Sequence, residues 1–204
     1  MTPPDATPSN WNLPNALTTL RIVMVPFFGW ALLVDGGDSV LWRCVAWALF
    51  VVAMVTDKVD GDIARSRDLV TDFGKIADPI ADKALTGMAF VGLSVVGELW
   101  WWVTIVVLLR EWGITLLRLW VIRYGVMAAG SGGKLKTVLQ TVALGLFVLP
   151  LRHLSHPLTG VGDVVWWLAA AVMAAAVALT VVTGADIVVK ALAVRRQGRG
   201  VHAG

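Results

Sequence analysis

Seven of the 14 acidic residues in this chain of 204 residues lie in one short window, between positions 57 and 82. They are Asp57, Asp60, Asp62, Asp68, Asp72, Asp78 and Asp82. The window adjoins long apolar segments. An acid at the centre of a bilayer costs at least about 2.5–3.5 kcal/mol, so it is usually paired, hydrated or functional. The cluster therefore predicts a chemical site and not merely a set of surface charges.

Four of these acids form two pairs by their spacing. Asp57 and Asp60 are three residues apart and share one helix face, and Asp78 and Asp82 are four apart and share another. If two antiparallel helices carry the pairs at the same depth, four carboxylates converge and divalent cations relieve their repulsion. Oxygen ligands suit hard ions such as Mg²⁺ or Mn²⁺, and all three histidines lie beyond position 150. We predict that the other three acids are solvated loop charges.

Small and basic residues accompany the acids. Gly61 and Gly74 leave room for the close approach of a ligand or a backbone. Arg65 lies one helical turn beyond the first acid pair, within reach of a phosphate. Pro79 suits the first turn of a helix, which places Asp78 near an N-cap. The pattern indicates a cation site next to a phosphate-binding surface.

Apolar helices must position these residues. The chain is 57% hydrophobic and 15% charged, with a mean hydropathy of +0.75, whereas soluble domains are about 45–50% apolar and about 25% charged. This composition excludes a disordered chain, a coiled coil and most soluble enzymes. The single cysteine, Cys44, excludes a disulfide framework. The net charge of +3 is too small to indicate a nucleic-acid partner.

Six segments are long and apolar enough to be transmembrane helices. They run over about 16–34, 40–64, 79–96, 99–124, 135–151 and 164–194. Basic residues favour one set of loops and the C-terminal tail, so the positive-inside rule places both termini in the cytoplasm. We predict an all-α polytopic membrane protein with an active-site cavity that faces the cytoplasm. Its parts are a flexible polar segment over 1–11, a six-helix domain over 12–195 and a basic flexible tail over 196–204.

The acidic window resembles a family signature. The series Asp57-x2-Asp60-Gly61-x2-Ala64-Arg65-x8-Gly74-x3-Asp78-x3-Asp82 matches the motif of the CDP-alcohol phosphatidyltransferases at every fixed position. The resemblance implies a six-helix membrane protein, usually a homodimer, in which an alcohol hydroxyl attacks the β-phosphate of a CDP-linked lipid and CMP is released. It implies that Asp57, Asp60 and Asp78 hold one divalent ion. It also implies that Asp57, Asp78 and Asp82 hold a second ion, with Asp82 as the general base.

The resemblance places the CDP-lipid along the same motif. The expected contacts are Gly61, Ala64, Arg65, Thr71 and Gly74. Ala64 must be small if the nucleotide is to lie against the helix. An ordinary loop hydroxyl is the equally weighted alternative for Thr71.

An acceptor that carries a phosphate needs fixed cations. Glycerol 3-phosphate is close to a dianion near neutral pH, because the second pKa of a phosphate monoester is about 6. The expected acceptor contacts are Arg21, Arg110, Arg118, Lys134 and Lys136. Pairing with Glu111, or snorkelling to the interface, is the alternative for Arg110. For the two lysines, a role as cytoplasmic loop charges under the positive-inside rule is an equally good alternative.

The family signature does not by itself identify the acceptor alcohol. The stretches Asn12-Leu13-Pro14-Asn15-Ala16-Leu17-Thr18 and Gly133-Lys134-Leu135-Lys136-Thr137 resemble the branch of the family that joins CDP-diacylglycerol to glycerol 3-phosphate. A cardiolipin synthase and a phosphatidylinositol phosphate synthase are alternatives, because the motif does not separate acceptors. A divalent-cation transporter is an alternative of another class, although transporters usually keep their site near the membrane midplane.

Overall fold

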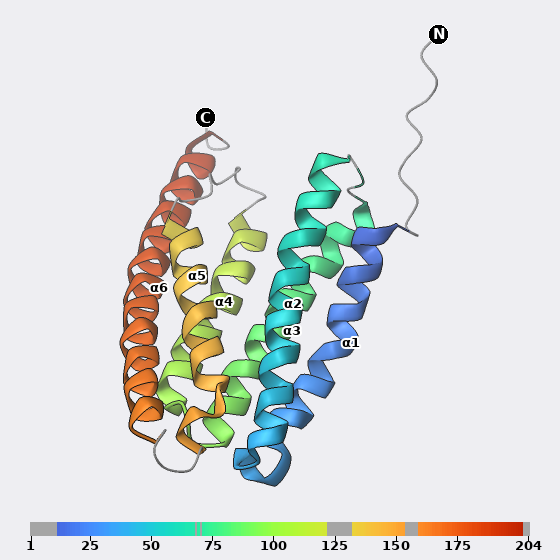
Figure 1. Ribbon diagram of the computed structural model, residues 1–204. Helices are drawn as coiled ribbons and strands as arrows, with labels where there is room; N and C mark the ends of the chain where they lie inside the picture. The colour runs from blue at the N-terminus through green and yellow to red at the C-terminus, as the bar shows by residue number, and fades with distance from the viewer. Residues whose placement is uncertain (1–11, 68, 70, 122–131, 154–158, 202–204) are drawn as a thin grey trace. The chain divides into compact units, whose positions relative to one another are not determined.

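The computed structural model describes residues 12–67, 69, 71–121, 132–153 and 159–201 (Figure 1). Every element in that part of the chain is helical, which confirms the all-α prediction. The elements are α1 (Leu13–Leu33), η1 (Val34–Gly37), α2 (Val40–Ser66), α3 (Asp72–Val95), α4 (Trp101–Val121), α5 (Gly132–Val148), η2 (Pro150–His153) and α6 (Thr159–Val201).

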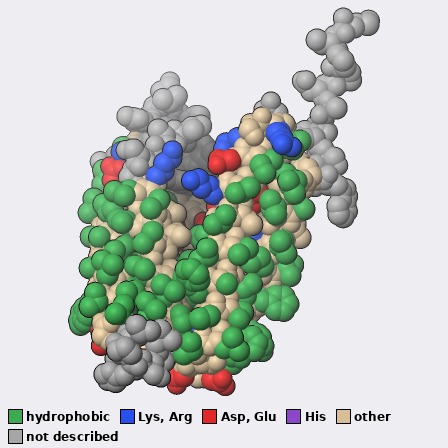
Figure 2. Space-filling view, viewed as in Figure 1, with side chains coloured by type: hydrophobic (Ala, Val, Ile, Leu, Met, Phe, Trp, Pro, Cys, Tyr) green, Lys and Arg blue, Asp and Glu red, His purple; other side chains and the backbone are tan. Residues whose placement is uncertain are grey.

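Four stretches of the described chain are long and apolar enough to cross a membrane. They are Leu13–Gly37, Val40–Ser66, Gly133–Arg152 and Gly160–Ala191. Hydrophobic side chains cover the sides of the helices in Figure 2, and charged side chains gather at the helix ends. The chain is therefore a helical membrane protein. The remaining two helices, α3 and α4, contain much of the charge on which the predicted chemistry depends.

The chain divides into two compact units, Met1–Glu98 with Phe147–Asp163, and Leu99–Leu146 with Val164–Gly204. In the first unit α1 packs along both α2 and α3, whereas α2 and α3 have little contact with each other. The core between these helices is apolar and includes Phe28, Phe50 and Leu85. In the second unit α4, α5 and α6 lie side by side (Figure 1).

The turn between α1 and α2 lies in the gap between the first two predicted transmembrane segments. Asp35 and Gly36 have positive φ angles of 53° and 67°, a conformation that glycine adopts without steric cost and that aspartate tolerates. Next to this turn, Trp30 packs edge-on against Trp42 with ring centroids 4.7 Å apart. Indole rings concentrate at membrane–water interfaces, so this pair marks the end of the apolar stretch.

The start of α3 differs from the prediction. The helix was expected to begin near Pro79 with Asp78 close to the N-cap, but it begins at Asp72 and contains Pro79 in its interior. Thr71 is the N-cap, because its side chain accepts a hydrogen bond from the backbone N–H of Gly74 at 3.1 Å. Asp78 is therefore a side chain of the helix body.

The buried side chain of Arg43 joins several segments of the first unit. It lies at the same end of that unit as the α1–α2 turn. The guanidinium of Arg43 donates to the backbone carbonyl of Phe147 at 2.8 Å and lies 3.4 Å from Glu98. Glu98 also lies 3.7 Å from Arg152, which donates to Asp163 at 3.0 Å. These contacts tie the start of α2 to the residues that follow α3 and to the end of α5.

We predict that the buried part of this network carries most of its stabilisation. Glu98→Gln removes the carboxylate that lies 3.4 Å from the buried Arg43 guanidinium, at a cost of about 3 kcal/mol. Thermal unfolding in detergent should therefore show a midpoint several degrees below that of the unaltered protein. Asp163→Asn is the control, because its ion pair with Arg152 is exposed and such pairs are worth about 0–1 kcal/mol. Equal effects of the two substitutions would contradict the prediction.

Candidate active site

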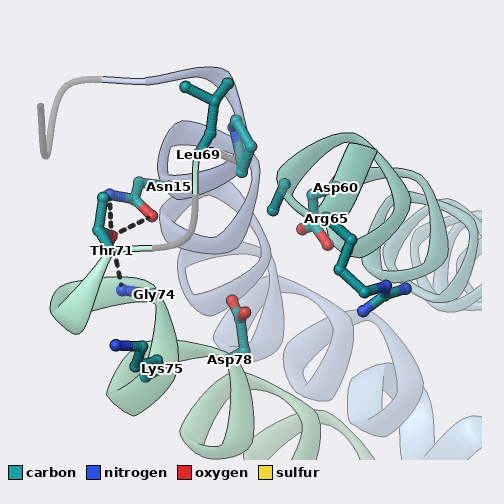
Figure 3. Close-up of a pocket in the computed structure, with 11 residues that line it drawn as sticks. Asn15, Asp60, Arg65, Leu69, Thr71, Gly74, Lys75 and Asp78 are labelled. Atoms are coloured by element: carbon teal, nitrogen blue, oxygen red, sulfur yellow. Dashed lines mark hydrogen bonds between the residues drawn. The ribbon is translucent and has the colours of Figure 1, made fainter. Parts of the chain in front are cut away.

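One cavity of about 210 Å³ lies in the first unit, between α1 and the facing ends of α2 and α3 (Figure 3). Its lining includes all five residues that were expected to contact the CDP-lipid: Gly61, Ala64, Arg65, Thr71 and Gly74. Asp60 and Asp78 line it as well, and Figure 3 shows their carboxylates directed into the space between the helices. The structure thus brings most of the acidic motif to one pocket.

A row of polar side chains on α1 holds the motif together. Asn12, Asn15, Thr18 and Arg21 recur at every third position, a spacing that keeps neighbours in the row on adjoining faces of a helix. Asn12 Nδ2 donates to the carbonyl of Leu69 at 3.3 Å. Each of the other three reaches a residue of the motif or of the loop within it. Sequence reasoning overlooked this row, although its regular spacing was the available signal.

Arg21 is the most deeply buried member of the row. Its side chain is completely buried, and its two Nη atoms donate to Oδ1 of Asp57 and Oδ2 of Asp60. A guanidinium can meet carboxylates with two parallel donors, which makes such contacts directional. Arg21 was expected to bind the acceptor phosphate, but the structure places it on the acids of α2.

Asp78 and Asp82, the paired acids of α3, lie in different surroundings. Asp78 lines the cavity and accepts a hydrogen bond from the hydroxyl of Thr18, with 2.6 Å between the oxygens. Asp82 lies one turn further along α3, is partly buried and is not part of the cavity lining. Asp57 is also outside the lining and is 42% exposed.

The acids fit a hard cation by the chemistry of their ligand atoms. Within the described residues, no three side chains of Asp, Glu, His or Cys already surround one point where an ion could sit. The carboxylates of Asp57 and Asp78 nevertheless both repel the charge of Asp60, and the guanidinium of Arg21 attracts it. Three carboxylates and one guanidinium carry a net formal charge of −2 (−3 + 1). Oxygen ligands with an excess of negative charge suit Mg²⁺ or Mn²⁺.

Thr71 links the cavity wall to α1. Its Oγ1 lies 2.8 Å from Nδ2 and 3.0 Å from Oδ1 of the buried Asn15, while it also caps α3 (Figure 3). A Cβ added to Gly74 would lie 3.0 Å from Asn15 Oδ1, and one added to Gly61 would lie 3.2 Å from the Arg65 guanidinium. A larger side chain at either glycine would therefore crowd these neighbouring side chains.

Two exposed cations stand at the cavity. Arg65 donates to Asp62 at 2.9 Å, and Lys75, which the sequence analysis did not single out, donates to Asp72 at 2.9 Å. Both acids are well exposed, which agrees with their expected role as solvated charges, although each lies on a helix. Exposed ion pairs contribute little, so both cations can turn toward an anionic ligand at low cost. Asp68 lies outside the described residues.

A second polar cluster lies in the other unit, with Glu111 of α4 at its centre. Arg110 donates to Glu111 at 3.0 Å and to Thr183 of α6 at 2.9 Å, and the buried Lys136 of α5 also donates to Glu111. The alternative interpretation of Arg110, pairing with Glu111, is confirmed. Lys134 is exposed, and the side chain of Arg118 lies outside the described part. The expected acceptor contacts are thus divided between the two units.

Comparisons with known proteins agree with the motif. The family model for CDP-alcohol phosphatidyltransferase matches residues 11–189. The chain is 54% identical over 181 residues to a protein of Mycobacterium tuberculosis (strain H37Rv) named "Probable phosphatidylglycerophosphate synthase", covering 89% of this chain and 82% of the relative. It is 38% identical over 172 residues to the "CDP-diacylglycerol--glycerol-3-phosphate 3-phosphatidyltransferase" of Bacillus subtilis (strain 168), covering 78% of this chain and 88% of the relative.

We predict that Thr71→Val destabilises the cavity wall. The substitution keeps the size of the side chain but removes the helix cap, which costs about 0.5–2 kcal/mol, together with the contact to Asn15. Thermal unfolding in detergent should show a lower midpoint, and Thr71→Ser should restore it. Thr137→Val is the matched control, since the exposed hydroxyl of Thr137 donates only to a carbonyl of its own helix in the described contacts. A destabilisation by Thr137→Val as large as that by Thr71→Val would speak against the role of the cap.

Proposed function

Because the chain belongs to the CDP-alcohol phosphatidyltransferase family, we propose that it transfers the phosphatidyl group of CDP-diacylglycerol to a hydroxyl of sn-glycerol 3-phosphate. The products are phosphatidylglycerophosphate and CMP. The observation that carries the proposal is the cavity in which Asp60, Asp78 and the five expected donor contacts meet. The names of the relatives support the choice of both substrates.

The donor would lie in the cavity with its diphosphate near the acids. Gly61 and Gly74 let the nucleotide approach the backbone of α2 and α3, and Ala64 adds only a methyl group to the wall. Arg65 and Lys75 lie where their cations can contact phosphate oxygens. Asp60 and Asp78 would repel the same oxygens, so the site needs further positive charge between them.

Divalent metal ions would provide that charge. We propose two ions, Mg²⁺ or Mn²⁺, one held by Asp57, Asp60 and Asp78 and the other by Asp57, Asp78 and Asp82. Ions bound in this way would neutralise the diphosphate and stabilise the departing phosphate oxygen of CMP. The oxygen-only composition of the site and its excess of negative charge support this proposal.

Asp82 would act as the general base. Its carboxylate accepts the proton of the acceptor hydroxyl as the hydroxyl oxygen forms a bond to the phosphorus of the phosphatidyl group. The bond between this phosphorus and the bridging oxygen breaks, and CMP leaves with the electron pair. A positioned base contributes about 10²–10⁴-fold to such a step.

The acceptor phosphate would be bound by the cations of the second unit. Arg110 and Lys136 share Glu111 as a counterion, which leaves one net positive charge for an anion. Arg118 remains a proposed member of this group, whereas for the exposed Lys134 we adopt the alternative role, that of a loop charge under the positive-inside rule. Arg21 is left out, because both of its Nη atoms are engaged with the acids of α2.

The distribution of charge supports a position in the membrane. By the positive-inside rule, the basic residues of the predicted cytoplasmic loops and of the tail favour a cytoplasmic position for both termini. We propose a multi-pass protein of the plasma membrane, with all six helices spanning the bilayer and the cavity open to the cytoplasm. We also propose a homodimer, on the family resemblance alone.

The proposal is tested by following CMP release from CDP-diacylglycerol by the purified protein with Mg²⁺ or Mn²⁺. We expect CMP release with glycerol 3-phosphate and little with inositol 1-phosphate or phosphatidylglycerol. Asp57→Asn is the control for the site, because it keeps the shape of the side chain and should abolish release while the protein stays folded. Release with inositol phosphate or phosphatidylglycerol in place of glycerol 3-phosphate would identify one of the two related synthases. Ion flux without any CMP would favour a transporter.

We predict that Lys136 and Lys134 differ sharply in their effect on the acceptor. Lys136→Met should raise the KM for glycerol 3-phosphate roughly ten- to a hundredfold, because a hydrogen bond to a charged group is worth about 1.5–3 kcal/mol. Lys134→Met removes the same charge from an exposed position on the same helix and should change this KM little. The KM for CDP-diacylglycerol should be unchanged in both variants. A rise confined to the donor KM would assign Lys136 to the donor site.

A further inference from the structure

We infer that α1 provides the outer hydrogen-bonding shell of the acidic site, in which Thr18 and Arg21 are positioning residues for three of the metal-binding carboxylates. The inference rests on the proposed metal site. It adds that the orientation of Asp57, Asp60 and Asp78, and hence the affinity for a divalent ion, depends on a helix that contributes no acid of its own to the site.

The contacts of Arg21 leave ligand atoms available. Its Nη1 meets Oδ1 of Asp57 and its Nη2 meets Oδ2 of Asp60, so that in the described contacts Arg21 engages one oxygen of each carboxylate. The contact with Arg21 therefore does not use the second oxygen of either carboxylate. Because the Arg21 side chain is completely buried, surrounding atoms fix its position and thereby the rotation of both carboxylates.

Thr18 orients the carboxylate of Asp78 on α3 in the same way. Its side chain is buried, and its hydroxyl lies 2.6 Å from Oδ1 of Asp78 and 3.1 Å from the carbonyl of Pro14. The contact again engages one of the two carboxylate oxygens. Thr18 and Arg21 are three residues apart on one helix, so their spacing is rigid.

The packing of the first unit makes this arrangement necessary. The acids belong to α2 and α3, but these two helices have little contact with each other and both pack on α1. Contacts through α1 therefore set the distance between Asp78 and the pair Asp57 and Asp60. Hydrogen-bonding partners of metal ligands typically account for a 10–100-fold difference in metal affinity.

A purely structural role explains the same contacts less well. Replacing a buried ion pair by apolar side chains of similar volume is often neutral or stabilising, so a joint between α1 and α2 does not itself require an arginine. The three acids would still carry a net charge of −2 with Arg21 in place (−3 + 1), which is suited to attracting a dication.

The inference is tested by titrating the purified full-length protein in detergent with Mn²⁺ and following the electron paramagnetic resonance of free Mn²⁺, with no substrate present. Thr18→Val should weaken Mn²⁺ binding about 10–100-fold, and Thr18→Ser should restore it. Thr19→Val is the matched control and should bind normally. It makes the same change one residue along α1, where the hydroxyl donates to the carbonyl of Asn15.

Two further variants separate the possible outcomes. Arg21→Lys keeps the buried charge but loses the fork of donors, so it should also weaken Mn²⁺ binding, and it serves as the test should Thr18→Val fail to fold. Asp78→Asn removes a proposed ligand and should weaken binding more than any other variant. Weak binding by Asp78→Asn with normal binding by both Thr18→Val and Arg21→Lys overturns the inference and leaves the proposed function intact. Normal binding by Asp78→Asn overturns the proposed metal site and the inference with it.

Discussion

The pairing of one buried arginine with two aspartates is the interaction on which the site depends. Arg21 reaches from α1 to Asp57 and Asp60 of α2, and its guanidinium has no access to solvent. Burying a charge is tolerable only with a well-placed partner, so α1 and α2 must meet in one register. In that register, Thr18 forms a hydrogen bond with Asp78, and Asn15 forms one with Thr71. The cavity, the start of α3 and the acidic pairs all follow from the position of α1.

A second buried pair lies toward the other end of α2, where Arg43 faces Glu98. Arg43 precedes Asp57 and Asp60 by 14 and 17 residues along one helix, which corresponds to roughly 21–26 Å at about 1.5 Å per residue. The hydrocarbon core of a bilayer is about 30 Å thick. Polar pairs near the two ends with apolar packing between them are the arrangement expected of a helix that crosses a membrane, where charges are expensive except near the surfaces.

The acidic site of the first unit and the Glu111 cluster of the second unit have opposite excesses of charge. The acids of the first unit outnumber the arginine that holds them, whereas Arg110 and Lys136 of the second unit outnumber Glu111. A reaction between a diphosphate and a phosphate monoester needs both kinds of site, one that takes up cations and one that takes up an anion directly. In each cluster a single residue of the opposite charge keeps like charges together in a setting of low polarity.

The sequence by itself determined the helical class, the membrane character and the acidic motif. These are local properties, because helix periodicity, hydropathy and the spacing of Asp57 to Asp82 are read within a few turns of one chain. Only the tertiary structure decided how α3 begins and what Arg21 does. The contact that secures the Thr71 cap joins residues 56 positions apart, and Arg21 meets its acids across 36 and 39 positions. Likewise Lys134 and Lys136 look equivalent in sequence, yet one is exposed and the other buried against Glu111. When a helix is apolar on most sides, as in a membrane, the spacing of its apolar residues gives little indication of the side that becomes buried, and the helices that pack against it decide this.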